Sequence, residues 1–140
     1  MFNRIEDNMY DELIERFCND KGFIKSNGFK IISLTSDEAK VEYPIVSSGL
    51  NPEGIVHGGL IFGLADTTAG ILGCTTFKFP LTTSANINYL RKCDGTKLIA
   101  EAHKLKVGKS IGYYIVNIYN DRNVLVATSN VNMYFTDINI

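Results

Sequence analysis

The stretch 51–76, NPEGIVHGGLIFGLADTTAGILGCTT, decides the fold of this chain of 140 residues. It opens with Asn51-Pro52 and Gly54, residue types that favour turns. An apolar run follows from Gly58 to Gly73, without lysine, arginine or glutamate. Its apolar residues fall on every face of a 3.6-residue period, which predicts a helix in the middle of a core. At about 16 residues it is shorter than the ~20 that a bilayer requires, so we expect the central helix of a soluble domain.

Asp66 is the single charged residue of this helix. A buried carboxylate is costly unless a partner or a shifted pKa compensates for the lost water. One explanation is structural: Asp66 accepts a hydrogen bond from the hydroxyl of Thr67 or Thr68, or it reaches the surface at a gap in the protein around the helix. The other is a working carboxylate, and the helix start at His57-Gly58-Gly59 favours it. Two glycines there leave backbone N–H groups uncovered at the positive end of the helix dipole. The pattern therefore predicts an oxyanion-type site.

The spacing between Gly58 and Asp66 predicts how such a site is assembled. Eight residues at ~1.5 Å each separate the two by about 12 Å along the helix. A general base and an oxyanion donor must both lie ~3 Å from the reacting group. One helix cannot bring them together. If both belong to one site, two copies of the helix must run antiparallel across a two-fold axis, which predicts a homodimer with shared active sites.

The segment 51–66, NPEGIVHGGLIFGLAD, resembles the motif of the hotdog-fold acyl-CoA thioesterases, in particular the PaaI-like branch of phenylacetic acid degradation. The positions that match the family pattern are Asn51, His57, Gly58, Gly59 and Asp66. The resemblance implies hydrolysis of an acyl- or aryl-CoA to the free acid and CoA. Coenzyme A enters as part of the substrate, and neither a cofactor nor a metal is implied.

The resemblance also implies a role for each matched residue. Asp66 acts as a general base or as a nucleophile, and the two alternatives stay open. The Gly58 N–H binds the thioester carbonyl oxygen, with Gly59 beside it in the substrate-binding set. His57 and Asn51 orient the thioester or the water, and His57 can stabilise the leaving thiolate.

The rest of the chain predicts an α+β fold in a single domain over 1–140. Apolar residues at i, i+3 and i+4 predict an amphipathic helix over 8–19, with Asn8 as its N-cap and Gly22 after its end. The period then changes to two, and we expect strands over 28–35, 39–46, 82–91, 97–107, 111–119 and 124–135. Six strands with one helix inserted after the second predict an antiparallel sheet. Wrapped around the long central helix, this is the hotdog fold that the resemblance implies, with its core at about 28–135 and an extra N-terminal helix.

The third predicted strand is unusually polar, and asparagine is depleted in sheets. An edge strand with one wet face is one explanation. The resemblance offers another, because the family holds the attacking water with a hydroxyl residue at the start of this strand. The segment 86–89, NINY, looks like the family's segment and places Thr82 at the hydroxyl position. Thr83 and Ser84 are its immediate neighbours, and we include Thr83 among the candidates for substrate binding.

Two basic segments are candidates for binding the phosphates of CoA. The first is Arg91 with Lys92, at the end of the third strand, and the second is the turn Gly108-Lys109-Ser110. Turn lysines are commonly just solvated, but similar segments line the nucleotide groove in related proteins. His103, which alternates on a strand, is expected to be structural.

Composition excludes several other classes of protein. The net charge of −1 offers no electrostatic footprint for nucleic acid or for an anionic membrane. Three cysteines without metal-ligand spacing imply neither a disulfide framework nor a metal site. The first residues lack the apolar segment of a signal peptide. We therefore expect a cytoplasmic protein, and the resemblance adds a homotetramer built as a dimer of dimers.

Two alternatives compete with the thioesterase interpretation. Hydratases and dehydratases share the hotdog fold, but the His-Gly-Gly motif does not resemble theirs. A non-catalytic protein that binds acyl-CoA, or a regulatory one, is the second alternative. The candidates for an apolar acyl pocket are Leu50, Ile61, Phe62 and Tyr89, and a single side chain there decides between aryl, short and long acyl chains.

Overall fold

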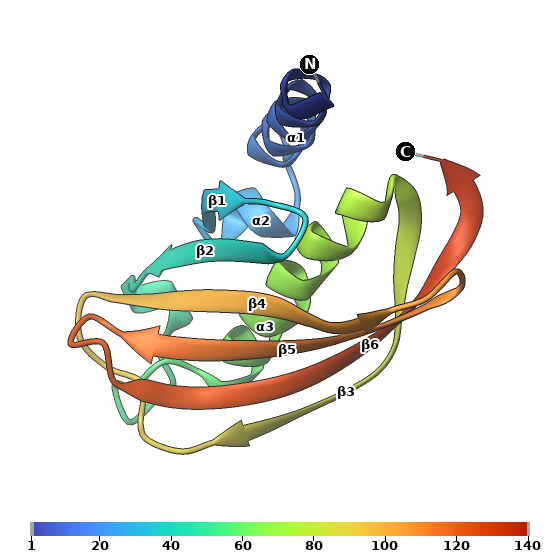
Figure 1. Cartoon of the computed structure of the whole chain (residues 1–140). Coiled ribbons are helices and arrows are strands. Elements are labelled where there is room, and N and C mark those ends of the chain that lie inside the picture. The colour runs from blue at the N-terminus through green and yellow to red at the C-terminus, as the bar shows by residue number, and fades with distance from the viewer. Residues whose placement is uncertain (1, 140) are drawn as a thin grey trace.

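The computed structural model describes the backbone of residues 2–139 and the side chains of residues 8–138. Within them, six strands form one sheet in the order β1-β2-β4-β5-β6-β3, and every neighbouring pair is antiparallel (Figure 1). The strands are β1 Lys30–Leu34, β2 Glu38–Pro44, β3 Lys78–Tyr89, β4 Lys97–Val107, β5 Ile111–Asn120 and β6 Leu125–Asn139. The helices are α1 Phe2–Cys18, α2 Phe23–Ser26 and α3 Gly58–Gly73, with short 3-10 turns at Ser47–Gly49 and Cys74–Thr76. The predicted α+β hotdog arrangement is confirmed.

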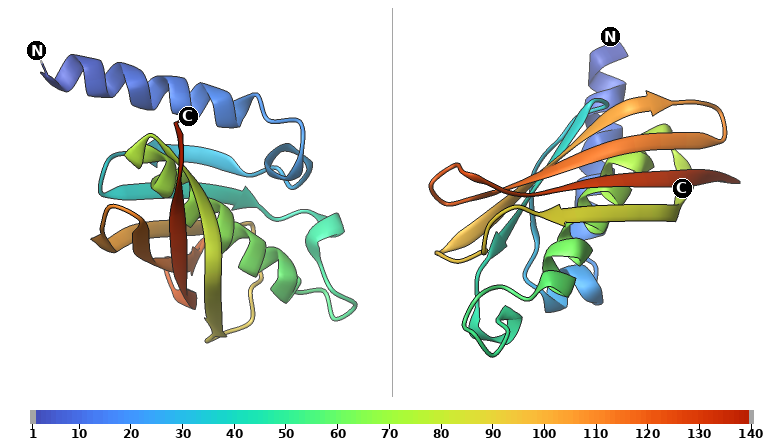
Figure 2. Two further views of the ribbon diagram at one scale, coloured as in Figure 1. Left: turned by 90° about the vertical axis from the view of Figure 1, so that its right-hand side faces the viewer. Right: turned by 90° about the horizontal axis from the view of Figure 1, so that it is seen from below.

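The sheet curves around one side of α3 (Figure 2). Inward-facing residues such as Ala39, Val41 and Tyr43 of β2 are fully buried, and the residues between them are partly exposed. Each fully buried large apolar side chain contributes about 1.5–3 kcal/mol relative to an exposed one. The buried residues of α3 are Ile61, Leu64, Ala65, Thr68, Ala69, Ile71, Leu72 and Gly73.

The other side of α3 is open in the single chain, where the sequence predicted burial all round. Asp66 and Gly59 are exposed, because they lie on the face that the sheet does not cover. Together with the 3-10 turn that follows it, α3 forms a run of 19 residues with a mean hydropathy of 1.2. Length and composition alone would allow such a run to span a membrane, but half of it is buried in this domain, as in the core helix of a soluble protein.

The N-terminal region differs from the prediction in two ways. First, α1 begins at Phe2 instead of residue 8, so Asn8 lies within the helix and does not cap it. Arg4 and Glu6 are good helix formers, which is consistent with this earlier start. Second, a four-residue helix, α2, follows Gly22 and was not predicted. Figure 2 shows α1 crossing above β1 and the C-terminal end of α3.

Strand β3 begins at Lys78, four residues earlier than predicted, and lies at the edge of the sheet. It pairs with β6, so the connection from β3 to β4 crosses the sheet and is not a hairpin. Nearly all of its residues are exposed. The register shifts between Thr82 and Ser84, which inserts Thr83 as a β-bulge.

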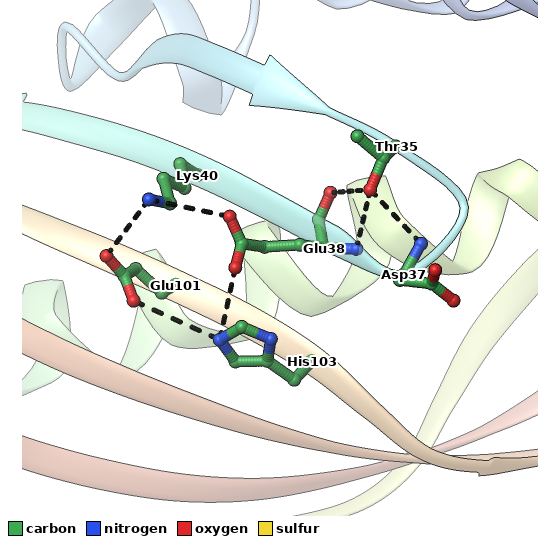
Figure 3. A network of polar contacts seen from close by, with 6 residues as sticks. All are labelled: Thr35, Asp37, Glu38, Lys40, Glu101 and His103. Carbon is green, nitrogen blue, oxygen red and sulfur yellow. Dashed lines mark hydrogen bonds and ion pairs between the residues drawn. The ribbon is translucent and has the colours of Figure 1, made fainter.

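The outer face of β2 and β4 carries a network of charged side chains (Figure 3). Lys40 Nζ lies 3.5 Å from Glu38 and 3.4 Å from Glu101. His103 Nε2 lies 3.5 Å and 3.9 Å from the same two carboxylates. Glu101 and then Glu38 raise the pKa of Lys40. His103, for which no catalytic role was predicted, therefore takes part in a cross-strand ion-pair network on the solvent side of the sheet.

Candidate active site

The N-terminus of α3 is organised by His57, which is its N-cap. His57 Nδ1 accepts a hydrogen bond of 2.8 Å from the Gly59 N–H, and its carbonyl oxygen accepts from Leu60 and Ile61. Among the described residues, the Gly58 N–H donates to no acceptor. It is therefore one of the free donors that a helix start presents to a ligand. Gly59 and His57 themselves are exposed.

Tyr89, at the end of β3, packs against the same helix start. Its hydroxyl donates to the Gly58 carbonyl oxygen at 2.7 Å. Burial, and then the neighbouring Cys93, raise the pKa of Tyr89, which keeps the phenol protonated as a donor. This contact ties the edge strand to the N-terminus of α3.

Asn51 holds the loop that leads into α3. Its Oδ1 accepts from the N–H groups of Glu53 at 3.1 Å and of Ile55 at 3.2 Å. Gly54 adopts a left-handed φ of +79°, which favours glycine. Asn51 thus has a local structural task, and its amide nitrogen makes no hydrogen bond within the described part of the chain. The sequence predicted the residue but not this turn.

A first cavity, of about 420 Å³, opens beside the start of α3. Six residues that the sequence analysis named line it: Asn51, Gly58, Ile61, Tyr89, Arg91 and Lys92. The other lining residues are Ile55, Val56, Leu90 and Cys93. The free N–H of Gly58 and the side chains of Arg91 and Lys92 therefore line this cavity. It can receive an oxygen atom and anionic groups.

Asp66 and Thr82 meet across the helix and the edge strand. Thr82 Oγ1 donates to Asp66 Oδ1 at 2.7 Å. The bulge makes this possible, because it turns Thr82 toward α3. Thr83 donates to the carbonyl oxygen of Asn132 at 3.2 Å, and Ser84 accepts from the Asn132 side chain at 3.0 Å. Of the three neighbouring hydroxyls, Thr82 alone reaches the carboxylate of Asp66.

A second cavity, of about 430 Å³, is lined by Asp66 and Thr82. Its other walls come from Thr67, Gly70, Ile71, Cys74, Phe79, Pro80 and Met133, and from the N-terminal residues Arg16, Phe17, Asp20, Phe23 and Ile24. From the sequence we predicted an amphipathic helix over 8–19 without a role in the site, so these five residues were missed. Of the apolar residues predicted for the acyl pocket, Ile61 and Tyr89 line the first cavity, and Leu50 and Phe62 line neither.

The two cavities share no lining residue. The turn Gly108-Lys109-Ser110 lies apart from both, at the end of the sheet where β3 begins: Lys78 Nζ donates to the Lys109 carbonyl oxygen at 3.2 Å. Arg91 follows the other end of β3, about 36 Å away along the strand at ~3.3 Å per residue. One chain therefore does not bring all the predicted residues together.

A group of metal-ligand type lies outside both cavities. The side-chain atoms of Glu38, Glu101 and His103 all lie within 4.8 Å of one another. This group was not predicted, because the pairing of β2 with β4 brings Glu38 and Glu101 together from distant positions in the chain. Lys40 already pairs with both carboxylates. The absence of a metal requirement stays a prediction.

Comparison with known proteins identifies the family. The model of the thioesterase superfamily matches residues 53–127, which is more than half of the chain. The chain belongs to the thioesterase superfamily. The expectation of a thioester hydrolase with the hotdog fold is confirmed at this level.

Several individual proteins resemble this chain in sequence or in structure. The Escherichia coli acyl-coenzyme A thioesterase PaaI is 34% identical over 105 residues, 74% of each chain. The structure of E. coli PaaI, from the phenylacetic acid degradation operon, matches with a TM-score of 0.85 at 27% identity, over 90% of this chain and 91% of that one. A Streptococcus mutans structure with bound acetyl-CoA matches with a TM-score of 0.74 at 27% identity, over 77% and 88%. An Archaeoglobus fulgidus protein is 30% identical over 96% of this chain and 82% of its own length.

Proposed function

We propose that this protein is an acyl-CoA thioesterase, which hydrolyses the thioester of an acyl- or aryl-CoA to the free acid and CoA. The observation that carries the proposal is the hydrogen bond of 2.7 Å between Thr82 and Asp66 at the wall of a cavity. The superfamily, the E. coli relative and the acetyl-CoA bound to the S. mutans protein support the same chemistry.

The reaction needs a group that delivers water to the thioester carbon. Thr82 occupies Oδ1 of Asp66, which leaves Oδ2 to take a proton from water or to attack the carbonyl carbon itself. The carbonyl oxygen becomes negative as the new bond forms. The free Gly58 N–H, at the positive end of α3, stabilises that charge. When the C–S bond breaks, the thiolate leaves and takes up the proton that Asp66 accepted from water, which gives CoA and the free acid. If Asp66 itself attacks, the thiolate takes a proton from solvent, and water then hydrolyses the anhydride to release the acid and restore the carboxylate.

A complete site requires two copies of the chain. Asp66 and Gly58 are about 12 Å apart along α3, and they line separate cavities. The open edge of β3 can pair with the β3 edge of a second copy, which sets two α3 helices antiparallel and hides an unpaired edge. Each site then combines Asp66 and Thr82 of one copy with Asn51, His57 and Gly58 of the other. We further propose a cytoplasmic tetramer of two such dimers.

The same pairing gathers the two basic segments. In an antiparallel pair of β3 strands, the Lys78 end of one copy lies beside the Tyr89 end of the other. The turn 108–110 of one copy then approaches Arg91 and Lys92 of the second copy. A cluster of cations from two chains is a suitable site for the phosphates of CoA.

The test is hydrolysis of a panel of acyl- and aryl-CoA thioesters by the wild type and by Asp66→Asn. We expect turnover by the wild type and a decrease in kcat of at least ~10² in the variant, the scale of a lost acid–base group. Asp37→Asn, on the β1–β2 turn, is a matched control that should keep full activity. Binding of acyl-CoA without any turnover would favour the non-catalytic alternative, and hydration of an enoyl-CoA would favour the hydratase alternative.

A further inference from the structure

The second cavity has a wall that the matched family segment does not include. The family match covers residues 53–127, whereas Arg16, Phe17, Asp20, Phe23 and Ile24 come from α1, α2 and the link between them. Phe23 stands out among them, because a large apolar side chain with 53% of its surface exposed faces the cavity.

Phe23 is held in place by its neighbours and is not a loose side chain. Asp20 Oδ2 accepts from the Ile24 N–H at 3.2 Å, which fixes the start of α2. The Phe23 ring packs edge-on against Phe29 at 5.6 Å, and Phe29 packs in the same way against Tyr43 at 5.7 Å. Phe29 and Tyr43 belong to the buried core. The ring is therefore anchored through two aromatic contacts to the inside of the domain.

The position of Phe23 over α3 depends on a glycine. A Cβ atom at Gly63 would lie 2.8 Å from Cζ of Phe23, so a side chain there would displace the ring. Gly63 precedes Asp66 by three residues, which puts both on one face of α3. Phe23 is thus one turn of helix away from the carboxylate.

The opposite direction along α3 is open. Gly70 follows Asp66 by four residues and lies on the same face. A Cβ atom at Gly70 would meet nothing closer than Cε of Met133 at 3.9 Å, so the cavity floor there has unused space. The apolar walls are Phe17, Phe23, Ile24, Ile71, Phe79 and Met133. The volume of about 430 Å³ falls in the range of small-molecule sites.

We propose that this cavity holds an apolar acyl group, that Phe23 closes its end and that the missing side chain of Gly70 leaves its floor open. The two positions then set the length of acyl chain that the enzyme accepts. This inference rests on the proposed thioesterase function and extends it to the substrate class. The mostly apolar walls favour an aliphatic or aromatic acyl group, and the one cation among the described lining residues, Arg16, is exposed on the N-terminal wall.

The experiment measures kcat/KM for straight-chain substrates from acetyl-CoA to dodecanoyl-CoA. Phe23→Ala removes the end wall, and we expect the ratio of long-chain to short-chain kcat/KM to rise by about tenfold or more. Gly70→Val fills the floor and should shift the ratio in the opposite direction by a similar factor. Ile32→Ala, at an exposed residue of β1 outside the cavity, is the control that should leave the profile unchanged.

An unchanged chain-length profile in both Phe23→Ala and Gly70→Val, with Tm values showing folded protein, would overturn the proposal. If Phe23→Ala does not fold, Phe23→Leu keeps an apolar contact and should give a smaller shift in the same direction. If the wild type hydrolyses none of these thioesters, the proposed function fails by itself. In that case, calorimetric binding of straight-chain carboxylates tests the role of Phe23. The chain length that binds most tightly should still increase in Phe23→Ala. The same preferred chain length in the wild type and the variant would reject the proposed role.

Discussion

The two cavities beside α3 have nearly equal volumes, about 420 and 430 Å³, but differ in the polar groups that line them. The first offers the backbone N–H of a helix start and two basic side chains, Arg91 and Lys92, next to apolar residues. The second offers the carboxylate of Asp66 bonded to the hydroxyl of Thr82, among mostly apolar walls that also include Thr67, Arg16 and Asp20. The first suits an oxygen atom and phosphates, and the second suits water and an apolar group. In the proposed mechanism, each cavity forms half of a thioesterase site, and neither half is sufficient alone.

The difference in construction also determines which substitutions can test each half. A backbone donor survives most side-chain changes, so proline is the replacement that removes it. A side-chain carboxylate is removed by a single isosteric change. Variants of the two kinds can therefore inactivate the two cavities independently and show whether they work together.

The largest effect is expected from removing the backbone donor of the first cavity. Gly58→Pro deletes the N–H, and proline is well accepted at the first position of a helix. We expect kcat to fall by about 10²–10³, the loss measured for one oxyanion donor. Gly58→Ala keeps the N–H and is the matched control, since its Cβ would meet Tyr89 at 3.3 Å and needs only a small adjustment. Equal kcat values for the two variants would remove Gly58 from the mechanism.

Mixing two inactive variants tests whether the cavities belong to one site. Asp66→Asn lacks the second cavity's carboxylate, and Gly58→Pro lacks the first cavity's donor. After subunit exchange at equal concentrations, half of the dimers should be mixed, with one intact site of two, so about a quarter of wild-type activity should return. Native mass spectrometry would verify the exchange. Verified mixed dimers without activity would show that the site is not shared.

A smaller effect is expected at Thr82, which supports Asp66 in the second cavity. Thr82→Val keeps the shape and removes the donor to Oδ1. A hydrogen bond to a charged group contributes about 1.5–3 kcal/mol, so kcat should fall about tenfold or somewhat more. Thr82→Ser retains the hydroxyl and should recover most of the activity in the same assay. A Val variant as active as the Ser variant would mean that the contact does not support catalysis.

The smallest effect concerns two thiols, one in each cavity. Cys93 lines the first and Cys74 the second. Burial is the main cause that raises the pKa of each thiol to about 11. At pH 8, only about one in a thousand of each thiol is therefore ionised. A thiol reagent should modify the exposed Cys18 first. Cys18→Ser should abolish the fast phase, and the slow phases should accelerate as pH rises toward 11. A fast phase that persists in Cys18→Ser would show that a cavity thiol is accessible.

Much of the fold could be predicted because its signals are local. The apolar period and the turn residues around α3 gave its bounds as Gly58–Gly73, and alternation gave β4 as 97–107, in agreement with the structure. Pairing of β3 with β6 was missed, because it depends on residues far apart in the chain. An apolar surface all round α3 predicted burial, but it carries no information on whether the same chain or another copy covers it.

The candidate site also has one part that the sequence could predict and one part that it could not. The motif from Asn51 to Asp66 was recognisable because the residue types and spacings lie within one segment. The contact of Thr82 with Asp66 depended on a bulge, which one inserted residue decides. Phe23 was not foreseen, because α2 is too short to show a helical period and the ring's position depends on Gly63, 40 residues later in the chain.

The position of β3 in the sheet also sets an order of events during synthesis. Its neighbour β6 ends at Asn139, 50 residues after the end of β3 at Tyr89 (139 − 89). At roughly 5–20 residues per second, a ribosome needs about 2.5–10 s to complete that distance. During these seconds both edges of β3 are unpaired, and after Lys78 the strand has no charged residue to discourage association. Slower translation of codons 90–139 should therefore lower the soluble yield. In the proposed dimer, a higher local concentration of folded chains should shorten the time for which the second edge of β3 stays open.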